Sequence, residues 1–304
     1  MMRIFKKTYW LFLGILTRFS PKASTSLRYL LSKRSRLNWT RPQSLDEKIS
    51  WLKVYVYNSS PLVAQCADKL RVRAYVSDLG FPELLNPLHS VFESVDDIDW
   101  NKLPSQFALK WSSGSGDNVI CEDRNTLDVA ESRKRLSDTR SDRSNWGSAE
   151  LQYKSSPNLL LCEAYIAAPD SLGLIDYKFY CYEGEPKYVL AIQGRGTGHA
   201  NYYLYDMEWN RVQGLLKSEG GEQGLSRPEG LEEAATFARA LSAPFPFVLV
   251  DLYIIQGRTI FGELTFTPAG GVSASMTKEG DRVLGEPLKW LFSPRGEDYV
   301  KKVQ

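Results

Sequence analysis

Two acidic residues, Asp251 and Glu263, lie on neighbouring segments that a glycine turn can fold against each other. Residues 248–254 and 259–266 are rich in β-branched and aromatic side chains, and Gly257 between them suits a tight turn. A turn centred on Gly257 places the two carboxylates opposite each other, where Cβ atoms are about 5 Å apart and like charges repel. A divalent cation that prefers hard oxygen ligands, such as Mg²⁺, would remove this repulsion. The hairpin therefore predicts a metal site.

Whether the two acids face each other depends on the register of this hairpin. With the turn centred as above, Leu249 faces Thr265 and Leu252 faces Gly262. Because side chains alternate between the two faces of a strand, Leu249 and Asp251 share one face. A slip of one residue would separate the two acids and leave them as a solvated pair. One carboxyl held protonated by the other is a further alternative, and the hairpin alone leaves these interpretations open.

A second segment has the composition of a phosphate-binding loop. Residues 107–110 form a short strand that ends in Lys110 and runs into a Ser/Gly loop. Small residues let backbone N–H groups approach an anion, and the lysine adds a positive charge. The lysine precedes the glycines, so the loop is not a Walker A motif, and an ordinary turn is the alternative. The candidate loop residues are Ser112, Ser113, Gly114, Ser115 and Gly116.

Three more charged residues stand in strand-like segments. Glu163 lies near the end of an apolar strand, where a carboxylate needs a hydrogen-bond donor. Asp176 and Lys178 are two residues apart, so an acid and a base lie on one face of a strand. A surface salt bridge between these two is the alternative interpretation.

The composition limits the kinds of chemistry. The chain has 304 residues, of which 43% are hydrophobic and 24% charged, as in an ordinary soluble protein of one large or two small domains. Its four cysteines lack C-x-x-C spacing and read as core thiols, and only two histidines are present. A zinc site or a histidine-based triad therefore has few candidates, and metal chemistry would use oxygen ligands.

The basic residues are concentrated at the N-terminus. The first 41 residues hold ten of the 38 Lys and Arg residues and none of the 36 Asp and Glu residues. The apolar run at 9–16 is too short to cross a bilayer, which takes about 20 residues, and the basic residues after it do not fit a signal peptide. This segment predicts an amphipathic helix that either lies on an anionic membrane surface or packs on the protein's own body. Both alternatives stay open.

The predicted elements mix helices with strands. Helical patterns cover residues 1–57, 61–80, 126–136 and 228–241, with a capping box at Ser44 and Glu47. Strands are expected at 107–110, 119–121, 159–166, 177–182, 187–192 and in the hairpin, and residues 137–156 are expected to form a polar loop. This order predicts an α+β protein with antiparallel sheets.

The ordered set of motifs resembles the ATP-grasp superfamily, and within it the TupA-like group, which is named for teichuronopeptide biosynthesis. The similarity covers about residues 38–290, and it is carried by segments 44–53, 68–71, 109–116, 162–166, 176–179, 250–253 and 261–266. The resemblance implies two α+β subdomains with antiparallel sheets that clasp ATP, at 61–166 and 167–304. A basic helical region, 1–60, precedes them.

The resemblance also implies roles for individual residues. Lys69 and Lys110 would hold ATP phosphates under the Ser/Gly loop, and Glu163 would accept a hydrogen bond from the adenine amino group. Asp170, by its spacing, is the candidate for the ribose, and Asp176 is a further cofactor-binding candidate. Lys178 and Arg195 are the catalytic candidates. Mg²⁺ would be held by Asp251, Glu263 and Thr265.

The implied function is an ATP- and Mg²⁺-dependent ligase of bacterial cell-surface polysaccharide synthesis. It would join an amine to a carboxylate through an acylphosphate, in the cytoplasm, with the inner face of the membrane as one candidate location. Relatives usually carry Arg where this chain has Leu249, so Arg195, Arg71 or Lys178 would have to compensate. The alternatives are a glycosyltransferase of the same pathway, which would need a metal-binding D-x-D motif in a nucleotide-sugar site, and a non-catalytic relative that binds nucleotide.

Overall fold

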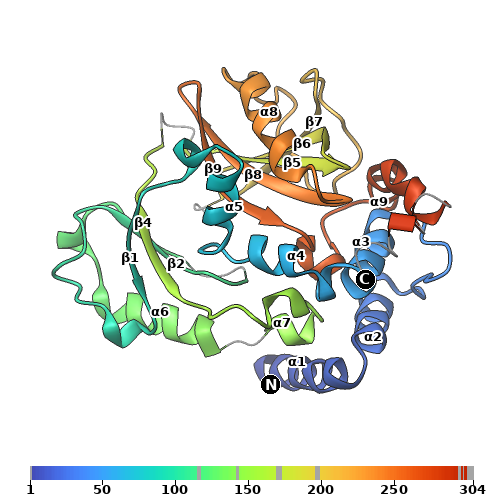
Figure 1. The fold of residues 1–304 in the computed structure, drawn as a ribbon, viewed down its shortest axis with the longest axis horizontal. Helices are drawn as coiled ribbons and strands as arrows, with labels where there is room; N and C mark the ends of the chain where they lie inside the picture. The colour runs from blue at the N-terminus through green and yellow to red at the C-terminus, as the bar shows by residue number, and fades with distance from the viewer. Residues whose placement is uncertain are drawn as a thin grey trace.

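The protein contains two antiparallel sheets with helices around them, as the computed structural model in Figure 1 shows. The structure describes residues 2–114, 118–141, 144–168, 173–195, 199–293, 296 and 298–299. The mixed helix and sheet class with antiparallel pairing confirms the predicted α+β fold.

The first sheet has four strands in the order β1-β4-β2-β3. These strands are β1 (Leu88–Phe92), β4 (Leu160–Ala164), β2 (Phe107–Trp111) and β3 (Val119–Cys121). It packs over a small core to which Trp100, Trp111 and Leu136 contribute. Helix α6 (Val129–Ser141) supplies Leu136 to this core. The β2–β3 hairpin carries the Ser/Gly loop at its tip.

The second sheet has five strands in the order β7-β6-β5-β8-β9. They are β7 (Asn201–Asp206), β6 (Glu185–Gln193), β5 (Asp176–Tyr182), β8 (Phe247–Ile255) and β9 (Arg258–Thr265). Helix α8 (Leu231–Ser242) packs on β5, β6 and β8 (Figure 1). Its buried residues recur every three or four positions, and four of the six are Ala or Ser, so the helix lies close to the strands.

Helices from the first third of the chain share the core of the second sheet. These are α3 (Leu45–Tyr55), α4 (Pro61–Cys66), α5 (Val72–Asp78) and the short η2 (Pro82–Leu84). A parallel bridge between Leu85 and Phe261 also joins this segment to β9. The Lys69 segment between α4 and α5 is thereby fixed next to the metal-candidate hairpin. The subdomain boundaries at residues 60 and 166 stay a prediction.

Several predicted elements differ from the observed ones. The helix expected over 61–80 is interrupted between α4 and α5, and the polar loop expected at 137–156 contains the end of α6, α7 (Ser144–Gly147) and a 3₁₀ turn at Leu151–Tyr153. Strands β1 and β7 and helix α9 (Lys278–Gly285) were not predicted. β1 is solvent-exposed or half-buried along its length, so it lacks the apolar run that identifies a buried strand. The capping box at Ser44 and Glu47 is confirmed.

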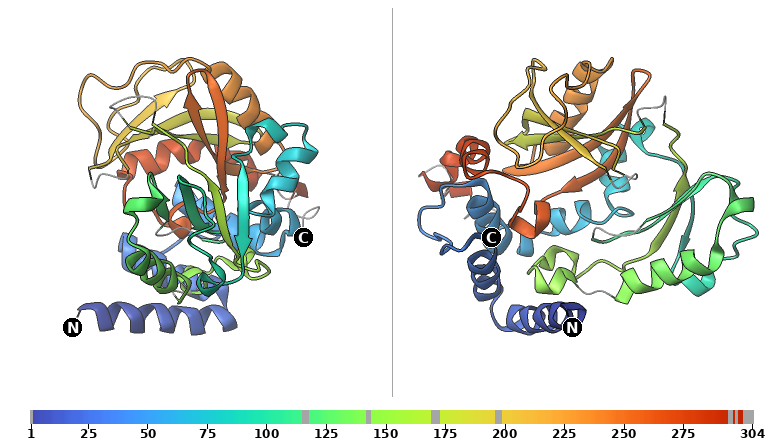
Figure 2. Two further views of the ribbon diagram at one scale, coloured as in Figure 1. Left: turned by 90° about the vertical axis from the view of Figure 1, so that its left-hand side faces the viewer. Right: turned by 180° about the vertical axis from the view of Figure 1, so that it is seen from behind.

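The N-terminal region consists of α1 (Met2–Phe19) and α2 (Pro21–Lys33), which meet nearly end to end. α1 contacts both α2 and α7 and runs along one edge of the molecule (Figure 2). The prediction of packing on the protein's own body is therefore correct for one side of α1. Among the described residues, none of the helices combines the length and apolar character needed to cross a membrane.

Two basic residues, one in α2 and one in α3, attach these helices to the turn after β9. Lys53 in α3 is fully buried, and its Nζ donates to the carbonyls of Ser148, at 2.7 Å, and Gly270, at 2.8 Å. Arg28 in α2 donates to the carbonyls of Gly270, at 2.7 Å, and Ala269, at 2.6 Å. Burial, with Arg28 nearby, lowers the pKa of Lys53 to about 7.

This lowered pKa predicts a pH-dependent stability. Between about pH 7 and 10.5 the folded Lys53 is neutral while the unfolded one is protonated. Stability rises with pH wherever the unfolded state binds more protons, so the free energy of unfolding should rise by at most about 1.4 kcal/mol per pH unit from this group. Lys53→Met should remove that increment, and the exposed Lys217→Met should not. Urea unfolding at pH 7, 8 and 9 measures it. Parallel pH profiles for Lys53→Met and the unmodified protein would contradict the assignment.

Candidate active site

The β8–β9 hairpin places Asp251 directly opposite Glu263, as predicted, although its turn lies elsewhere. The turn residues are Gln256 and Gly257, with φ of 49° and 77°, and Ile255 pairs with Arg258. Two positive φ values are what a two-residue type I′ hairpin turn requires. The turn is therefore centred between Gln256 and Gly257 and not on Gly257 as predicted, so the pairs next to the turn differ from the predicted ones by one residue.

A β-bulge at Gly262 restores the predicted pairing. Between the turn and the bulge, Leu252 faces Phe261, so its predicted pairing with Gly262 is wrong. The extra residue shifts the register by one, and beyond it Asp251 faces Glu263 and Leu249 faces Thr265. A Cβ atom at Gly262 would lie 3.0 Å from the carbonyl oxygen of Asp251, so glycine permits this close approach.

Each of the two carboxylates has a lysine beside it. Lys178 on β5 pairs with Asp251 across the β5–β8 ladder, and its Nζ contacts Asp251 Oδ2 in a buried ion pair. Lys69 comes from the α4–α5 segment, and its Nζ lies 3.1 Å from Glu263 Oε2. The repulsion expected between the acids is therefore offset by two cations, one from each side of the site.

The remaining oxygen atoms fit a hard metal ion. Asp251 Oδ1 is buried and accepts no hydrogen bond within the part of the chain that the structure describes. Thr265 Oγ1 lies 3.5 Å from Glu263 Oε1, so a hydroxyl stands beside the second carboxylate. Mg²⁺ is usually bound by one or two carboxylates together with phosphate and water. The described residues contain no cluster of three or more His, Cys, Asp or Glu ligands.

The two acids differ in their electrostatic surroundings. Burial, opposed by Lys178 and reinforced by Glu263, raises the pKa of Asp251. Burial would also raise the pKa of Glu263, but Lys69 and Lys178 outweigh it and lower this pKa below its usual range. The two acids therefore differ in the direction of their pKa shifts: the cations around Glu263 favour its ionised form, whereas burial disfavours the ionised form of Asp251 despite Lys178.

Asp68 organises the segment that carries Lys69. It is fully buried, and its Oδ1 accepts from the backbone N–H groups of Leu70, at 2.9 Å, and Arg71, at 3.0 Å. Its Oδ2 accepts from the hydroxyls of Ser112, at 3.0 Å, and Ser156. Asp68 belongs to a motif seen in the sequence, but its role was not predicted, because the two hydroxyl donors, Ser112 and Ser156, lie far away along the chain.

The loop residues lie beside Lys69. The Lys69 backbone N–H donates to the Ser112 carbonyl, and its Nζ donates to the Gly114 carbonyl, both at 2.7 Å. The Ser113 hydroxyl donates to Asn158 Oδ1 at 2.7 Å. Ser115 and Gly116 lie outside the described residues, so their predicted role stays a prediction.

Removal of the Asp68 carboxylate tests this arrangement. Asp68→Ala leaves two backbone donors and two hydroxyls without their acceptor, and hydrogen bonds to a charged group contribute about 1.5–3 kcal/mol each. We expect a lower free energy of unfolding and weaker ATP binding, and partial rescue by Asp68→Asn. The exposed Asp96, which pairs with Arg133 at 3.2 Å, gives the control Asp96→Ala, with a loss within about 1 kcal/mol. Chemical denaturation and nucleotide titration measure both. Normal ATP affinity in Asp68→Ala would contradict a positioning role.

Lys110 and Glu163 are brought together on the first sheet. Ala108 pairs with Glu163, so Lys110, two residues further along β2, shares its face, and Nζ lies 2.6 Å from Glu163 Oε2. Arg73 from α5, which was not predicted, lies 3.6 Å from Glu163 Oε1. The buried carboxylate thus has charged partners, and its predicted contact with adenine stays a prediction.

Asp176 and Lys178 share a face of β5, but their ion pairs are with other residues. Arg195 lies 3.0 Å from Asp176 Oδ2, and Lys178 pairs with Asp251. The alternative interpretation, a surface salt bridge between Asp176 and Lys178, is therefore wrong, because each residue forms an ion pair with a different partner. Asp170 lies outside the described residues.

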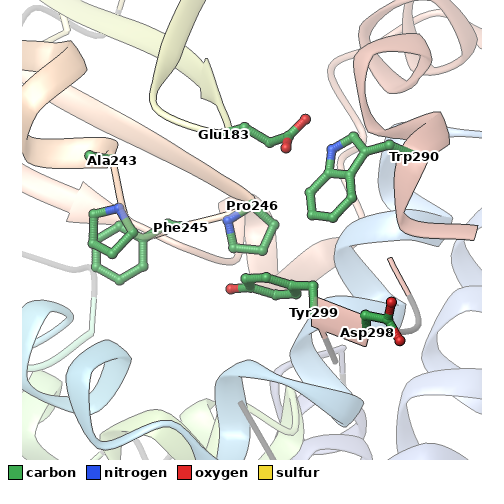
Figure 3. Close-up of a pocket in the computed structure, with 8 residues that line it drawn as sticks. Glu183, Ala243, Phe245, Pro246, Trp290, Asp298 and Tyr299 are labelled. Atoms are coloured by element: carbon green, nitrogen blue, oxygen red, sulfur yellow. The ribbon is translucent and has the colours of Figure 1, made fainter. Parts of the chain in front are cut away.

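A separate cavity lies at the opposite end of these strands. It has a volume of about 550 Å³ and contains the rings of Phe245, Trp290 and Tyr299 (Figure 3). Glu183, which follows β5, and Pro246, which precedes β8, form its other walls. Lys178 on β5 and Asp251 on β8 lie five residues away from Glu183 and Pro246, toward the other end of the strands. This cavity is therefore not part of the candidate active site.

Solved ATP-grasp structures resemble this chain only distantly. The D-alanine–D-alanine ligase from Bacillus anthracis, complexed with ATP, has 14% identity and a TM-score of 0.46, with 81% of this chain and 71% of that one covered. The D-alanine–D-alanine ligase from Coxiella burnetii has 14% identity and a TM-score of 0.45, with coverage of 86% and 65%. An L-amino acid ligase from Bacillus licheniformis has 12% identity and a TM-score of 0.43, with coverage of 80% and 52%.

A search of curated proteins found no significant match. The model of one protein family, described as TupA-like ATPgrasp, matches residues 47–289. This range contains most of α3, both sheets, Asp68 with Lys69, and the opposed acids of the β8–β9 hairpin. Because the match covers most of the sequence, this chain belongs to the TupA-like ATP-grasp family.

Proposed function

We propose that this protein is an ATP- and Mg²⁺-dependent ligase that joins a carboxylate to an amine. The observation that carries the proposal is the meeting of Asp251 and Glu263 with Lys69 and Lys178, which come from separate parts of the fold. A phosphoryl group in transfer needs mainly positioning and neutralisation of its charge. Paired carboxylates for a metal and lysines for phosphate oxygens supply both.

Each candidate residue has a proposed task. Lys69 and Lys110 would bind phosphate oxygens under the loop of residues 112–116, and Glu163 would accept from the adenine amino group. Asp170 and Asp176 would complete nucleotide binding. Asp251, Glu263 and Thr265 would hold Mg²⁺, which when bound neutralises phosphate charge. Lys178 and Arg195 would stabilise the charge that develops on the transferring group.

The proposed reaction has two steps. A substrate carboxylate oxygen attacks the terminal phosphorus of ATP, the bond to ADP breaks, and an acylphosphate forms. An amine nitrogen then attacks the acyl carbon, phosphate leaves with the electron pair of the broken C–O bond, and the amine loses a proton. The cations of the site would first stabilise the transferring phosphoryl group and then the departing phosphate.

The proposed pathway is bacterial cell-surface polysaccharide synthesis. The family, named for teichuronopeptide, supports a carboxylate-bearing sugar, such as a uronic acid, with an amine or amino acid as partner. We place this reaction in the cytoplasm, at the inner face of the cell membrane. A mass-spectrometric comparison of surface glycan from cells with and without this chain would test the pathway, because an unchanged glycan would count against it.

A glycosyltransferase is a weaker candidate. The sequence contains one D-x-D pattern, Asp97-Ile98-Asp99, at the short η3 turn (Val95–Asp97). Asp97 accepts from the backbone N–H of Ser94 at 2.8 Å, and Asp99 pairs with Lys102 at 3.0 Å. Both acids therefore stabilise an exposed turn, and the opposed pair in the hairpin is the better metal candidate.

The direct test is phosphate release from Mg²⁺-ATP in a screen of uronic acids against amino acids. The ligase proposal predicts phosphate release that requires both substrates, and a product heavier than the acid by the amine less water. Release without an amine would indicate a kinase or hydrolase. A chain that binds ATP and releases no phosphate with any pair would be the non-catalytic alternative.

A further inference from the structure

One side of α1 is held firmly against the body of the protein. Leu13 and Thr17 are buried, and the hydroxyl of Ser24 in α2 donates to the carbonyl of Leu13 at 3.3 Å. Gly147 in α7 lies so close to Trp10 that a Cβ atom there would overlap the indole ring. Helix α1 is thus packed against the rest of the protein, and these contacts determine which of its faces points outward.

The opposite side of α1 is apolar and exposed. Leu11, Phe12, Ile15 and Phe19 have exposed fractions of 67%, 53%, 48% and 83%. Leu11, Ile15 and Phe19 recur every four residues, which places them on one helix face. We call these four residues the outward ridge. Of the nine large hydrophobic residues that are exposed in the described chain, six lie between positions 11 and 31.

The charge around the ridge has one sign. The first 41 residues contain ten basic and no acidic residues, whereas the whole chain has a net charge of only +2. Arg18 and Lys22, beside the ridge in sequence, are exposed. An exposed apolar face with cations and no anions complements a surface that offers apolar chains behind anionic head groups.

We propose that the outward ridge lies in the interface of an anionic lipid bilayer, with α1 parallel to the membrane plane. Figures 1 and 2 show α1 along one edge of the molecule, with the remainder of the described fold on its other side, so none of the described elements obstructs this approach. The ridge inserts among acyl chains while the basic residues contact phosphate head groups. Both sheets then stand away from the lipid.

A second copy of this chain is the competing occupant of the ridge. Pairing of two ridges would bring together two N-terminal regions with ten basic residues each and no acid between them. Like charges at close range oppose such a dimer, particularly at low salt. The charge pattern therefore favours the lipid surface over self-association.

The test compares two matched sets of exposed substitutions in the full chain. The ridge variant carries Leu11→Ser, Phe12→Ser, Ile15→Ser and Phe19→Ser. The control variant carries Leu79→Ser, Val91→Ser and Ile120→Ser, which are exposed apolar residues on other elements. Each protein is sedimented with vesicles of phosphatidylcholine alone, or with phosphatidylglycerol added, without nucleotide, and its mass in solution is measured.

The proposal predicts binding of the unmodified and control proteins to the anionic vesicles and little binding to the neutral ones. The ridge variant should bind at least about tenfold more weakly, and salt should weaken binding further. Equal binding by the ridge variant would overturn the proposal, as would a dimer that only the ridge variant loses. Circular dichroism checks that all variants are folded. Because ATP is absent, failure here leaves the proposed ligase activity untouched.

Discussion

Asp251→Asn should abolish Mg²⁺-dependent phosphate release, with a loss of at least about 10²- to 10³-fold, the usual effect of removing one key electrostatic group. The substitution keeps the shape of the side chain and removes the charge that a metal needs. Glu263→Gln should act in the same direction, since Glu263 lies directly opposite. Activity should be measured over a range of Mg²⁺ concentrations, because a variant that binds the metal more weakly needs a higher Mg²⁺ concentration to reach the same activity.

The same substitutions should differ in their effect on stability. The sequence alone suggests that removing one of two opposed acids relieves repulsion and stabilises the protein. In the structure, Asp251→Asn leaves the buried Lys178 without its counter-charge, so the free energy of unfolding should fall, by about 3 kcal/mol if the pair behaves as buried pairs usually do. Glu263→Gln should lower the free energy of unfolding by less, because the Glu263 side chain is 30% exposed. In addition, Lys69 Nζ would still donate its hydrogen bond to the Gly114 carbonyl.

A surface ion pair between β6 of the same sheet and helix α8 provides the control. Glu185 and Arg239 lie 3.0 Å apart with about half of each side chain exposed, so Glu185→Gln should change stability by less than about 1 kcal/mol and leave activity intact. Metal-independent activity of both Asp251→Asn and Glu263→Gln would rule out the metal assignment.

The hairpin shows why a correct prediction can follow from local patterns. Strand composition identified β8 and β9, and the glycine located the turn to within one residue. The predicted pairing is off by one residue between the turn and Leu252, and the extra residue Gly262 in the bulge restores the predicted register at Asp251. A bulge depends on backbone packing that the residue pattern does not encode.

The lysines that neutralise Asp251 and Glu263 could not be predicted from local sequence patterns. Lys178 meets Asp251 because β5 lies next to β8, and strand order within a sheet does not follow from either strand alone. Lys69 reaches Glu263 from 194 positions earlier in the chain, through the packing of α4 and α5 on the second sheet. Asp68 accepts from the hydroxyls of Ser112 and Ser156 for the same reason, whereas its backbone donors at residues 70 and 71 are local. Local sequence thus indicated the acids, whereas the tertiary fold determined which cations neutralise them.

Lys178→Ala should lower turnover by roughly 10²- to 10³-fold, while Arg195→Ala should have a smaller effect. Lys178 Nζ is buried beside Asp251, where a charge interacts strongly, whereas the Arg195 side chain is 58% exposed and pairs with Asp176. Lys187→Ala, an exposed lysine on the neighbouring β6, is the control and should retain full activity. Phosphate release at saturating ATP separates turnover from binding. Equal, small effects of all three substitutions would exclude Lys178 from catalysis.

Leu249 tests whether Lys178 supplies the charge that the family resemblance led us to expect from an arginine at position 249. Leu249 is buried, pairs with Tyr180 on β5 and with Thr265 on β9, and shares a face with Asp251. If Lys178 already supplies the needed charge, Leu249→Arg should bring no gain, and burial of a guanidinium in that tight space should lower the melting temperature. If the natural chain only binds nucleotide, Leu249→Arg should be the variant that gains phosphate release. Activity confined to Leu249→Arg would therefore contradict the ligase proposal for the natural protein, whereas activity in the natural chain that falls with Lys178→Ala would identify Lys178 as the replacement.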